Sequence, residues 1–192
     1  MYLYYQRCGP YLYPKYCSLH IYQEGNGDQT ATVGQSGTGN LAEAGQMGTA
    51  GIVTISQEAD ASANIADIFQ DTESMNGTAT ITQISGLYNE AWIYQYGSDD
   101  IAEITQSGSE LGANFAGIGQ YGTSGSAASI TQDGDENRVE LYQEYGTNQA
   151  AAVRQTGLLH LAEVYQMNDN KTAQITQSGS ANRANVYQDW EI

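Results

Sequence analysis

Apolar and polar residues alternate in short segments along this chain, and each of these segments ends in a glutamine. Ala66 and Ile68 precede Gln70 at intervals of two residues, and the segment ATITQ (79–83) has the same spacing. Successive side chains of a β-strand point to opposite faces, so this alternation predicts strands with one buried face. The expected strands end at Gln23, Gln35, Gln46, Gln57, Gln70, Gln83, Gln95, Gln106, Gln120, Gln132, Gln143, Gln155, Gln166, Gln177 and Gln188.

A repeated amphipathic helix is the alternative, but a period of about 3.6 residues is incompatible with constancy at every second position. The segments are also rich in Ile, Val, Thr and Tyr, which favour strands. Short loops such as SGTG (36–39) and DGDE (133–136) separate the segments and have the composition of turns. The predicted fold class is therefore all-β.

The segments are of two alternating kinds, so the true repeat is a pair of strands. The first kind ends in Thr-Gln or a close relative, and the second usually ends in an aromatic residue followed by Gln. Residues 1–18, which are rich in Tyr, are expected to be an N-terminal tail, either flexible or a partial cap. Residues 19–192 are expected to contain about seven repeats, at 29–46, 51–70, 77–95, 100–120, 126–143, 149–166 and 171–188.

One pair of such short strands buries too little apolar surface to be stable alone. Stacking solves this problem, because each strand pairs with its counterpart one repeat further on and the inner residues form a continuous column. The predicted architecture is a stacked strand–turn–strand β-solenoid, with two parallel, in-register sheets in a cross-β arrangement.

Buried amides are costly unless they are paired. In-register stacking places each amide beside its counterpart, so each is expected to give an N–H to the side-chain carbonyl of the neighbouring repeat. This structural ladder is expected to contain the fifteen glutamines and also Asn40, Asn64, Asn89, Asn114, Asn137 and Asn182. His160 stands where a further Asn is expected, and we interpret it as a substitute within the ladder.

A stack of strands ends in unpaired edges unless a cap covers them. The last segment, ANVYQDWEI (184–192), has no capping pattern. An open edge that resembles every other level of the stack is a template for another copy of the chain. Contacts of this heterologous kind generate filaments, so self-association into a fibre is expected.

The chain is strongly acidic, since 6 Lys and Arg against 22 Asp and Glu give a net charge of −16. Nucleic acid is therefore not an expected partner, because phosphate binding needs clustered basic residues. Residues 17–136 contain no Lys or Arg. This acidic block is expected to form a solvated surface that keeps the chain soluble or, in a stronger form of the idea, delays self-association.

No apolar run is long enough to span a membrane. The first 20 residues lack the continuous apolar stretch and the cleavage site of a secretory signal, so either a signal has been removed or export uses another route. Cys8 and Cys17 form either one local disulfide or two free thiols. They lack companions at metal-binding spacing, and neither a metal nor a cofactor is expected.

The motif Q-x-G-x-x-N-x-A-x-x-x-Q occurs in full at 35–46 and at 177–188. It resembles the curlin repeat of bacterial curli fibre subunits, and the resemblance covers residues 19–188. The resemblance implies a secreted functional amyloid that polymerises with itself at the cell surface into fibres for biofilm matrix and adhesion. It also implies a nucleator subunit and an outer-membrane secretion channel as partners. The departures are additional repeats and longer turns at 58–64 and 108–114.

Two alternatives have the same fold: a fibre nucleator subunit, and a monomeric β-solenoid adhesin with blocked ends. An enzyme is not expected, because catalysis needs unlike groups at one place. His20 and His160 are far apart in sequence, and Glu43, Glu140 and Glu163 share one outward position, where like charges repel. The outward aromatic residues are expected to form a broken stripe for packing between repeats, or for a contact with another fibril or a sugar: Tyr22, Phe69, Tyr94, Tyr142, Tyr165 and Tyr187.

Overall fold

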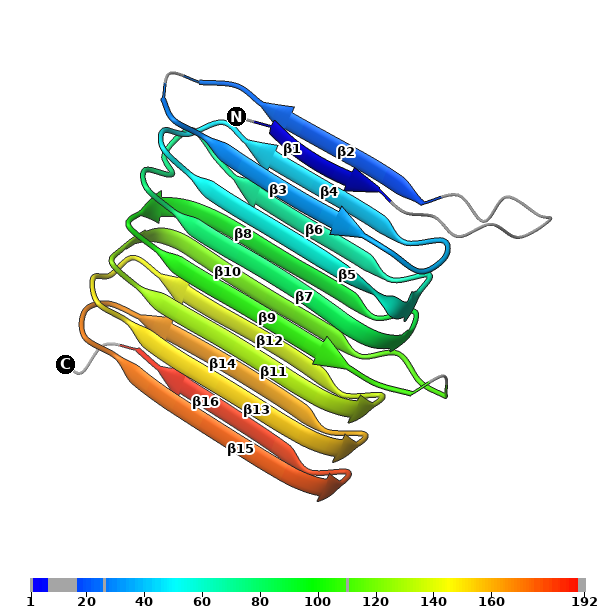
Figure 1. Ribbon diagram of the computed structural model, residues 1–192. Coiled ribbons are helices and arrows are strands. Elements are labelled where there is room, and N and C mark those ends of the chain that lie inside the picture. Colours follow the sequence, from blue (N-terminus) through cyan, green and yellow to red (C-terminus); the bar gives the residue numbers. More distant parts are fainter. Residues whose placement is uncertain (1, 7–16, 26, 110, 190–192) are drawn as a thin grey trace.

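Two parallel β-sheets make up the whole of the regular structure in residues 2–6, 17–25, 27–109 and 111–189, which the computed structural model describes (Figure 1). The first sheet contains β1 (Tyr2–Gln6), β3 (Thr30–Gln35), β5 (Ile52–Ser62), β7 (Thr78–Leu87), β9 (Ile101–Ser107), β11 (Ala127–Asp135), β13 (Ala150–Leu158) and β15 (Thr172–Ser180). The second sheet contains β2 (Ser18–Gln23), β4 (Leu41–Gln46), β6 (Ile65–Gln70), β8 (Glu90–Ser98), β10 (Phe115–Ser124), β12 (Arg138–Glu144), β14 (Leu161–Met167) and β16 (Arg183–Gln188).

The chain passes from one sheet to the other after every strand, so odd-numbered strands form one sheet and even-numbered strands form the other. We call an odd-numbered strand and the even-numbered strand that follows it a rung. Each strand is parallel to its neighbours one rung away and in register with them up to the glutamine, as Gln95, Gln120 and Gln143 show in the second sheet. Beyond the glutamine the register shifts after Gln57 in the β5–β7 pair and after Tyr121 in the β8–β10 pair. The predicted all-β solenoid, with two parallel in-register sheets and about seven turns, is confirmed.

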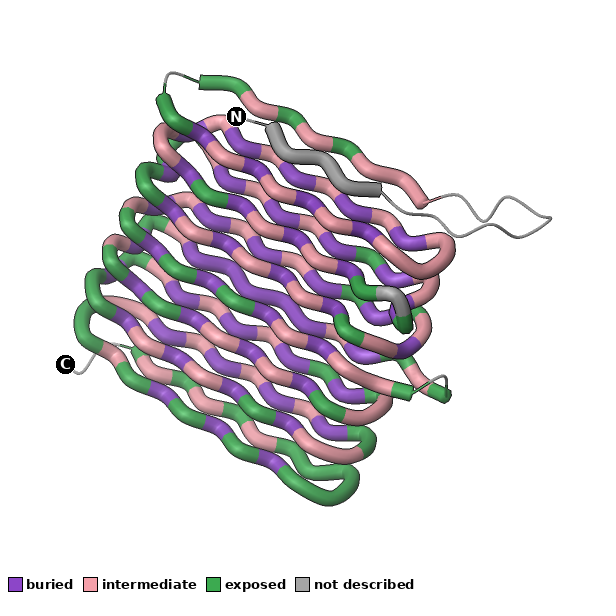
Figure 2. The backbone as a smooth tube through the Cα atoms, in the orientation of Figure 1, coloured by how far each residue is buried: buried purple, intermediate pink, exposed green. Residues whose placement is uncertain are grey.

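The core lies between the two sheets and consists of small and branched residues that repeat from rung to rung. Ala79 and Ile81 of β7, and Ala91 and Ile93 of β8, are completely buried. Figure 2 shows the resulting alternation of buried and more exposed residues along each strand. The two sheets pack closely because small Ala side chains alternate with branched Ile or Val side chains along the inner face of each strand.

The structure adds one strand to the elements that the alternation predicted. Within the predicted tail of residues 1–18, β1 pairs with β3 and places Gln6 opposite Gln35. Tyr2 and Tyr4 stand at the register positions of Ala31 and Val33, so this segment lacks the small-and-branched pattern by which the other strands are found. Cys8 lies outside the described residues, whereas Cys17 is half-buried directly before β2.

The stacking explains the glycine of the Q-x-G motif. Gly134 has a φ of 126°, and a Cβ atom on this residue would lie 2.0 Å from the carbonyl oxygen of Gly157. A Cβ atom on Gly157 would lie 1.9 Å from the carbonyl oxygen of Gly179. The turns of successive rungs therefore touch through their backbones, and no side chain fits between them.

Candidate functional site: the buried amide ladders

Two continuous columns of glutamine side chains run through the stack, one in each sheet. The expectation that every strand ends at its glutamine is wrong, since β7 continues past Gln83 to Leu87 and β8 continues past Gln95 to Ser98. Nε2 of Gln95 donates to Oε1 of Gln120 (2.9 Å), and Nε2 of Gln120 donates to Oε1 of Gln143 (2.9 Å). The same bond joins the glutamines of the first sheet, from Gln35 to Gln177. It also joins those of the second sheet, from Gln23 to Gln188. The structure thus brings all fifteen glutamines of the sequence-based set into these two columns.

From Gln57 and Gln70 onward, and at Gln35, the ladder glutamines also tie the two sheets together. Nε2 of Gln83, in β7 of the first sheet, lies 2.9 Å from the carbonyl oxygen of Ile65 and 3.1 Å from that of Asn89. Both carbonyls belong to the starts of second-sheet strands. An amide nitrogen has two N–H donors, so one serves the next rung and the other serves the opposite sheet. This second function was not expected from the sequence.

The asparagines form a column of a different kind. Oδ1 of Asn64 accepts the backbone N–H of Asn89 (2.7 Å), and Oδ1 of Asn89 accepts the backbone N–H of Asn114 (2.9 Å). The Nδ2 atom of Asn89 donates to the carbonyl of Ser85 in its own turn (2.9 Å). The expected bond between neighbouring Asn amides is therefore replaced by side chain–backbone bonds, because the shorter Asn side chain stays beside the main chain of the turn.

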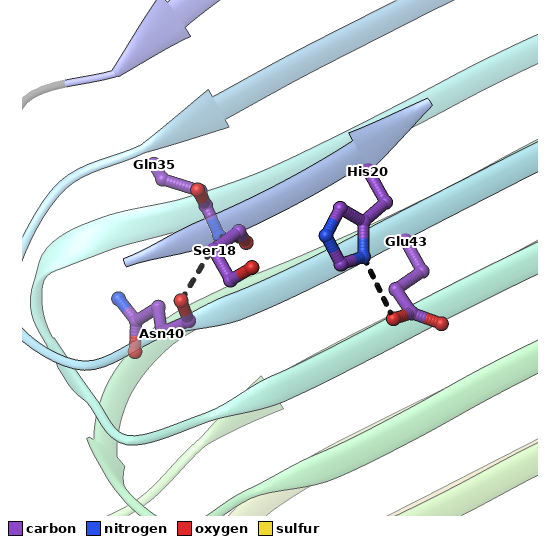
Figure 3. A network of polar contacts seen from close by, with 5 residues as sticks. All are labelled: Ser18, His20, Gln35, Asn40 and Glu43. Atoms are coloured by element: carbon purple, nitrogen blue, oxygen red, sulfur yellow. Dashed lines mark hydrogen bonds and ion pairs between the residues drawn. The ribbon is translucent and has the colours of Figure 1, made fainter. Parts of the chain in front are cut away.

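The column contains all six asparagines of the sequence-based set: Asn40, Asn64, Asn89, Asn114, Asn137 and Asn182. Figure 3 shows its first member, where the carbonyl of Asn40 accepts the backbone N–H of Ser18 (2.9 Å). Gln35 lies beside this bond, and its Nε2 atom is 3.1 Å from the carbonyl oxygen of Ser18. Asn182, in the last described rung, is exposed, whereas the other five are buried.

His160 continues the asparagine column and is buried, with 1% of its surface exposed. Its backbone N–H donates to Oδ1 of Asn137 (3.1 Å), and its Nδ1 atom lies 3.2 Å from the backbone nitrogen of Asn182. A backbone N–H can only donate, so Nδ1 accepts and the proton of the neutral ring is on Nε2. Nε2 then donates to the carbonyl of Thr156 (3.2 Å). The imidazole thus reproduces both bonds of an Asn side chain.

We expect His160→Asn to change the free energy of unfolding by less than about 1 kcal/mol, because Asn supplies the same acceptor and donor. His160→Leu is expected to cost about 2 kcal/mol, because the Asn182 N–H and the Thr156 carbonyl lose their partner. Urea unfolding of the two variants measures the difference. Equal losses of stability would show that the ring contributes volume and not hydrogen bonds.

A further column, at the start of the odd-numbered strands, was not identified from the sequence because no single residue type is kept along it. Its members are Gln29, Gly51, Gly77, Asp100, Ser126, Gln149 and Lys171. Asp100 is fully buried; it accepts the Thr123 hydroxyl (2.7 Å) and the backbone N–H of Ser126 (2.9 Å). Burial raises the pKa of the Asp100 carboxyl, and these two hydrogen bonds oppose the rise. The only available signal was its position directly before a strand, where Asn stands in the other sheet.

We expect Asp100→Asn to stabilise the fold at pH 7 by about 1 kcal/mol, the usual size of a stabilising substitution. The folded state holds the Asp100 proton more tightly than the unfolded state, so wild-type stability falls as pH rises through the raised pKa. Asn removes this charge and keeps the acceptor for Ser126. Urea unfolding should show that Asp100→Asn has a higher free energy of unfolding than the wild type, by more at pH 7 than at pH 4. A lower free energy of unfolding for the variant at pH 7 would contradict this account.

The outward face of the second sheet carries acids and aromatic rings in adjacent columns. Glu43 lies opposite Asp67, and Glu140 lies opposite Glu163. Arg183 reduces the expected repulsion, since its Nη2 atom lies 3.8 Å from Oε2 of Glu163. Nδ1 of His20 lies within hydrogen-bond distance of Oε1 of Glu43, at 3.2 Å (Figure 3). Arg138 pairs with Glu140.

The aromatic stripe occupies the next outward position of the same strands. Tyr165 and Tyr187 are stacked with centroids 5.1 Å apart, and the hydroxyl of Tyr94 donates to Asp67 (2.7 Å). The stripe is less broken than the sequence suggests, because rings cover its glycines. A Cβ atom on Gly45 would lie 2.6 Å from the ring of Phe69. The members are Tyr22, Phe69, Tyr94, Tyr142, Tyr165 and Tyr187, with Gly45 and Gly119 between them.

The described residues contain no group of three or more His, Cys, Asp or Glu side chains placed to hold a metal ion. They also contain no helix that is long and apolar enough to cross a membrane. His20 lies on β2, and His160 lies between β13 and β14, so the structure does not bring the two histidines together. The polar groups of the site are arranged for pairing between rungs.

Comparisons with protein-family models, with curated proteins and with solved structures found no match. The resemblance to curlin subunits therefore depends on the repeat motif alone.

Proposed function

We propose that this protein is a self-assembling structural subunit of an extracellular, curli-like amyloid fibre. Copies add end to end, and the first rung of one copy pairs with the last rung of another. The extracellular location, the part in biofilm matrix and adhesion, and a nucleator and secretion channel as partners follow from the resemblance of the repeat motif.

The observation that carries the proposal is the state of the glutamines in the last described rung. Gln177 donates to the carbonyl of Leu161 (3.1 Å) and Gln188 to that of Thr172 (3.0 Å), which are bonds of the inter-sheet kind. Inside the stack the amide also donates to a glutamine one rung further on, and within residues 2–6, 17–25, 27–109 and 111–189 these two have no such acceptor. A glutamine from another copy supplies that acceptor.

The apolar surface of this rung supports the same proposal. Ala184 and Val186 occupy inner positions of β16 but are only half-buried, whereas Ala162 and Val164, their counterparts in β14, are buried. Another rung would cover them as β16 covers β14. Burying this apolar surface favours addition.

Gly179 provides the experiment. A Cβ atom on Gly157 would strike the backbone of the next rung, but a Cβ atom on Gly179 would meet nothing within 4 Å. Gly179→Ala therefore costs only the strain of its φ of 94° in the isolated chain, and it blocks the approach of another rung. We expect the wild-type protein to form fibres with a ~4.7 Å cross-β reflection, and Gly179→Ala to remain monomeric while keeping its β-type circular dichroism.

Ser180→Ala is the matched control, since it adds no atom to the same exposed turn and should assemble at the wild-type rate. Fibre mass is followed by sedimentation and electron microscopy. A wild-type chain that stays monomeric under all conditions would favour a monomeric adhesin. Fibres of unchanged yield from Gly179→Ala would contradict addition at the β15–β16 face.

A further inference from the structure

The outward face of the first sheet has a hollow of about 350 Å³ over β9, β11, β13 and β15. Its floor exists because small residues point outward there: Ala127 and Ser129 on β11, and Ala150 and Ala152 on β13. The lining is predominantly apolar, and Glu103 at one end is its only charged residue. Arg154 is exposed two residues beyond Ala152 on the same face.

The outward face of the second sheet carries large aromatic side chains in its middle rungs. Trp92 stacks on Tyr94 (centroids 5.1 Å apart) and reaches over Gly117, where a Cβ atom would lie 2.2 Å from its ring. Tyr96 stacks on Tyr121 (5.2 Å). These rings pack against one another and form a ridge along the stack. This packing is already present in the single chain. Towards the last rungs the column of rings continues through Tyr142, Tyr165 and Tyr187, and it borders a hollow of about 290 Å³ beside Glu140 and Glu163.

The charges of the two faces decide how two copies can lie side by side. The second face carries Glu43, Asp67, Glu140 and Glu163. Among the described residues, only two Arg or Lys side chains, Arg138 and Arg183, lie beside these acids. Two such faces brought together would therefore repel each other. Two hollows facing each other would leave a void without contact. A ridge in a hollow avoids both problems, and it places Arg154 of one copy near the acids of the other.

We propose that copies of this protein associate laterally by docking the aromatic ridge of one copy in the alanine-lined hollow of another. The partner is a second copy of this chain, and the contact is heterologous, so it extends into layers of parallel stacks. The strands of both sheets repeat at ~4.8 Å in the same direction, so side-by-side stacks keep the same rung spacing.

The test uses the full chain and the substitution Ala152→Glu. The carboxylate fills the floor of the hollow and faces the acidic ridge, so we expect assemblies one stack wide where the wild type forms bundles. Electron microscopy measures the width, and sedimentation velocity detects side-by-side pairs if the stacks are short. Ala152→Ser is the matched control and should bundle like the wild type, because it preserves both the space and the charge.

A mixing experiment distinguishes this heterologous contact from a general effect of charge. Glu163→Lys, on the ridge, should restore bundling when it is mixed with Ala152→Glu, because each copy then offers the other a complementary face. Bundles of wild-type width from Ala152→Glu alone would overturn the proposal, as would the absence of lateral association in the wild type. The proposal goes beyond end-to-end growth and is independent of it. If Gly179→Ala has no effect on fibres, lateral docking is still tested by the width of the assemblies that Ala152→Glu forms.

Discussion

Gly157→Ala is expected to lower the free energy of unfolding by about 4 kcal/mol, a loss seen only where a substitution has a specific steric cause. The cause here is double. The φ of 122° is one that L-residues rarely adopt, and the new Cβ atom would lie 1.9 Å from the carbonyl oxygen of Gly179. Relief requires β13 and β15 to separate at their ends. For a chain of this length the midpoint of thermal unfolding should fall by roughly 8–16 °C.

Gly34→Ala is the matched control. Gly34 points outward from β3, has no neighbouring atom within 4 Å of its ideal Cβ position and has no strained φ. Alanine there should change stability by no more than about 0.5 kcal/mol. Circular dichroism melts of both variants compare the same substitution in two environments. Similar melting temperatures would mean that the turns of neighbouring rungs do not touch as described.

Gln120→Ala is expected to cost about 3 kcal/mol, because it combines a small cavity with unpaired buried groups. Oε1 of Gln143 loses its donor, and the side chain of Gln95 loses its contact with the next rung. The carbonyls of Ile101 and Ser126 also lose a donor from Gln120. The effect should be local, with the strongest increase in hydrogen exchange in β8, β10 and β12.

Gln174→Ala supplies the control for the same change of side chain. Gln174 points outward from β15 and is exposed, so its removal should alter stability by less than about 0.5 kcal/mol. Urea unfolding measures both variants. If the two substitutions cost the same, the buried ladder is not a source of stability, and the repeated glutamine needs another explanation.

The regular parts of this fold could be predicted from the sequence because the same constraint repeats at each level. Residues that alternate with a period of two, such as Ala66, Ile68 and Gln70 on one side, exclude a helix and predict a strand with one buried face. Short turns alone would also suit a β-hairpin, but the alternation of two kinds of segment favours stacking, in which each strand pairs with its own kind one repeat further on. The register also follows, because a Gln that must meet its own counterpart fixes the alignment of each neighbouring pair.

The irregular parts could not be predicted because their chemistry depends on backbone positions that do not repeat in residue type. The side chain of Asp100 accepts a backbone N–H of the next rung, as that of Asn64 does. The residues at the corresponding positions of the neighbouring rungs are not Asp or Asn, so the sequence does not reveal this role. The left-handed residues that precede the strands are equally varied, and include Tyr88 (φ 60°) and Leu159 (φ 58°). The strand β1 has Tyr2 and Tyr4 at the register positions of Ala31 and Val33, so the pattern of small and branched residues does not identify it.

The glutamine bonds all point in one direction, from the lower-numbered rung to the higher. The stack is therefore polar: side-chain carbonyl acceptors face outward at one end, and side-chain N–H donors face outward at the other. If two molecules met through their donor ends, N–H groups would face N–H groups and could not hydrogen-bond. Only head-to-tail joining therefore continues the chain of amide hydrogen bonds. An assembly joined head to tail would have chemically distinct tips, and we expect the two tips to add subunits at different rates.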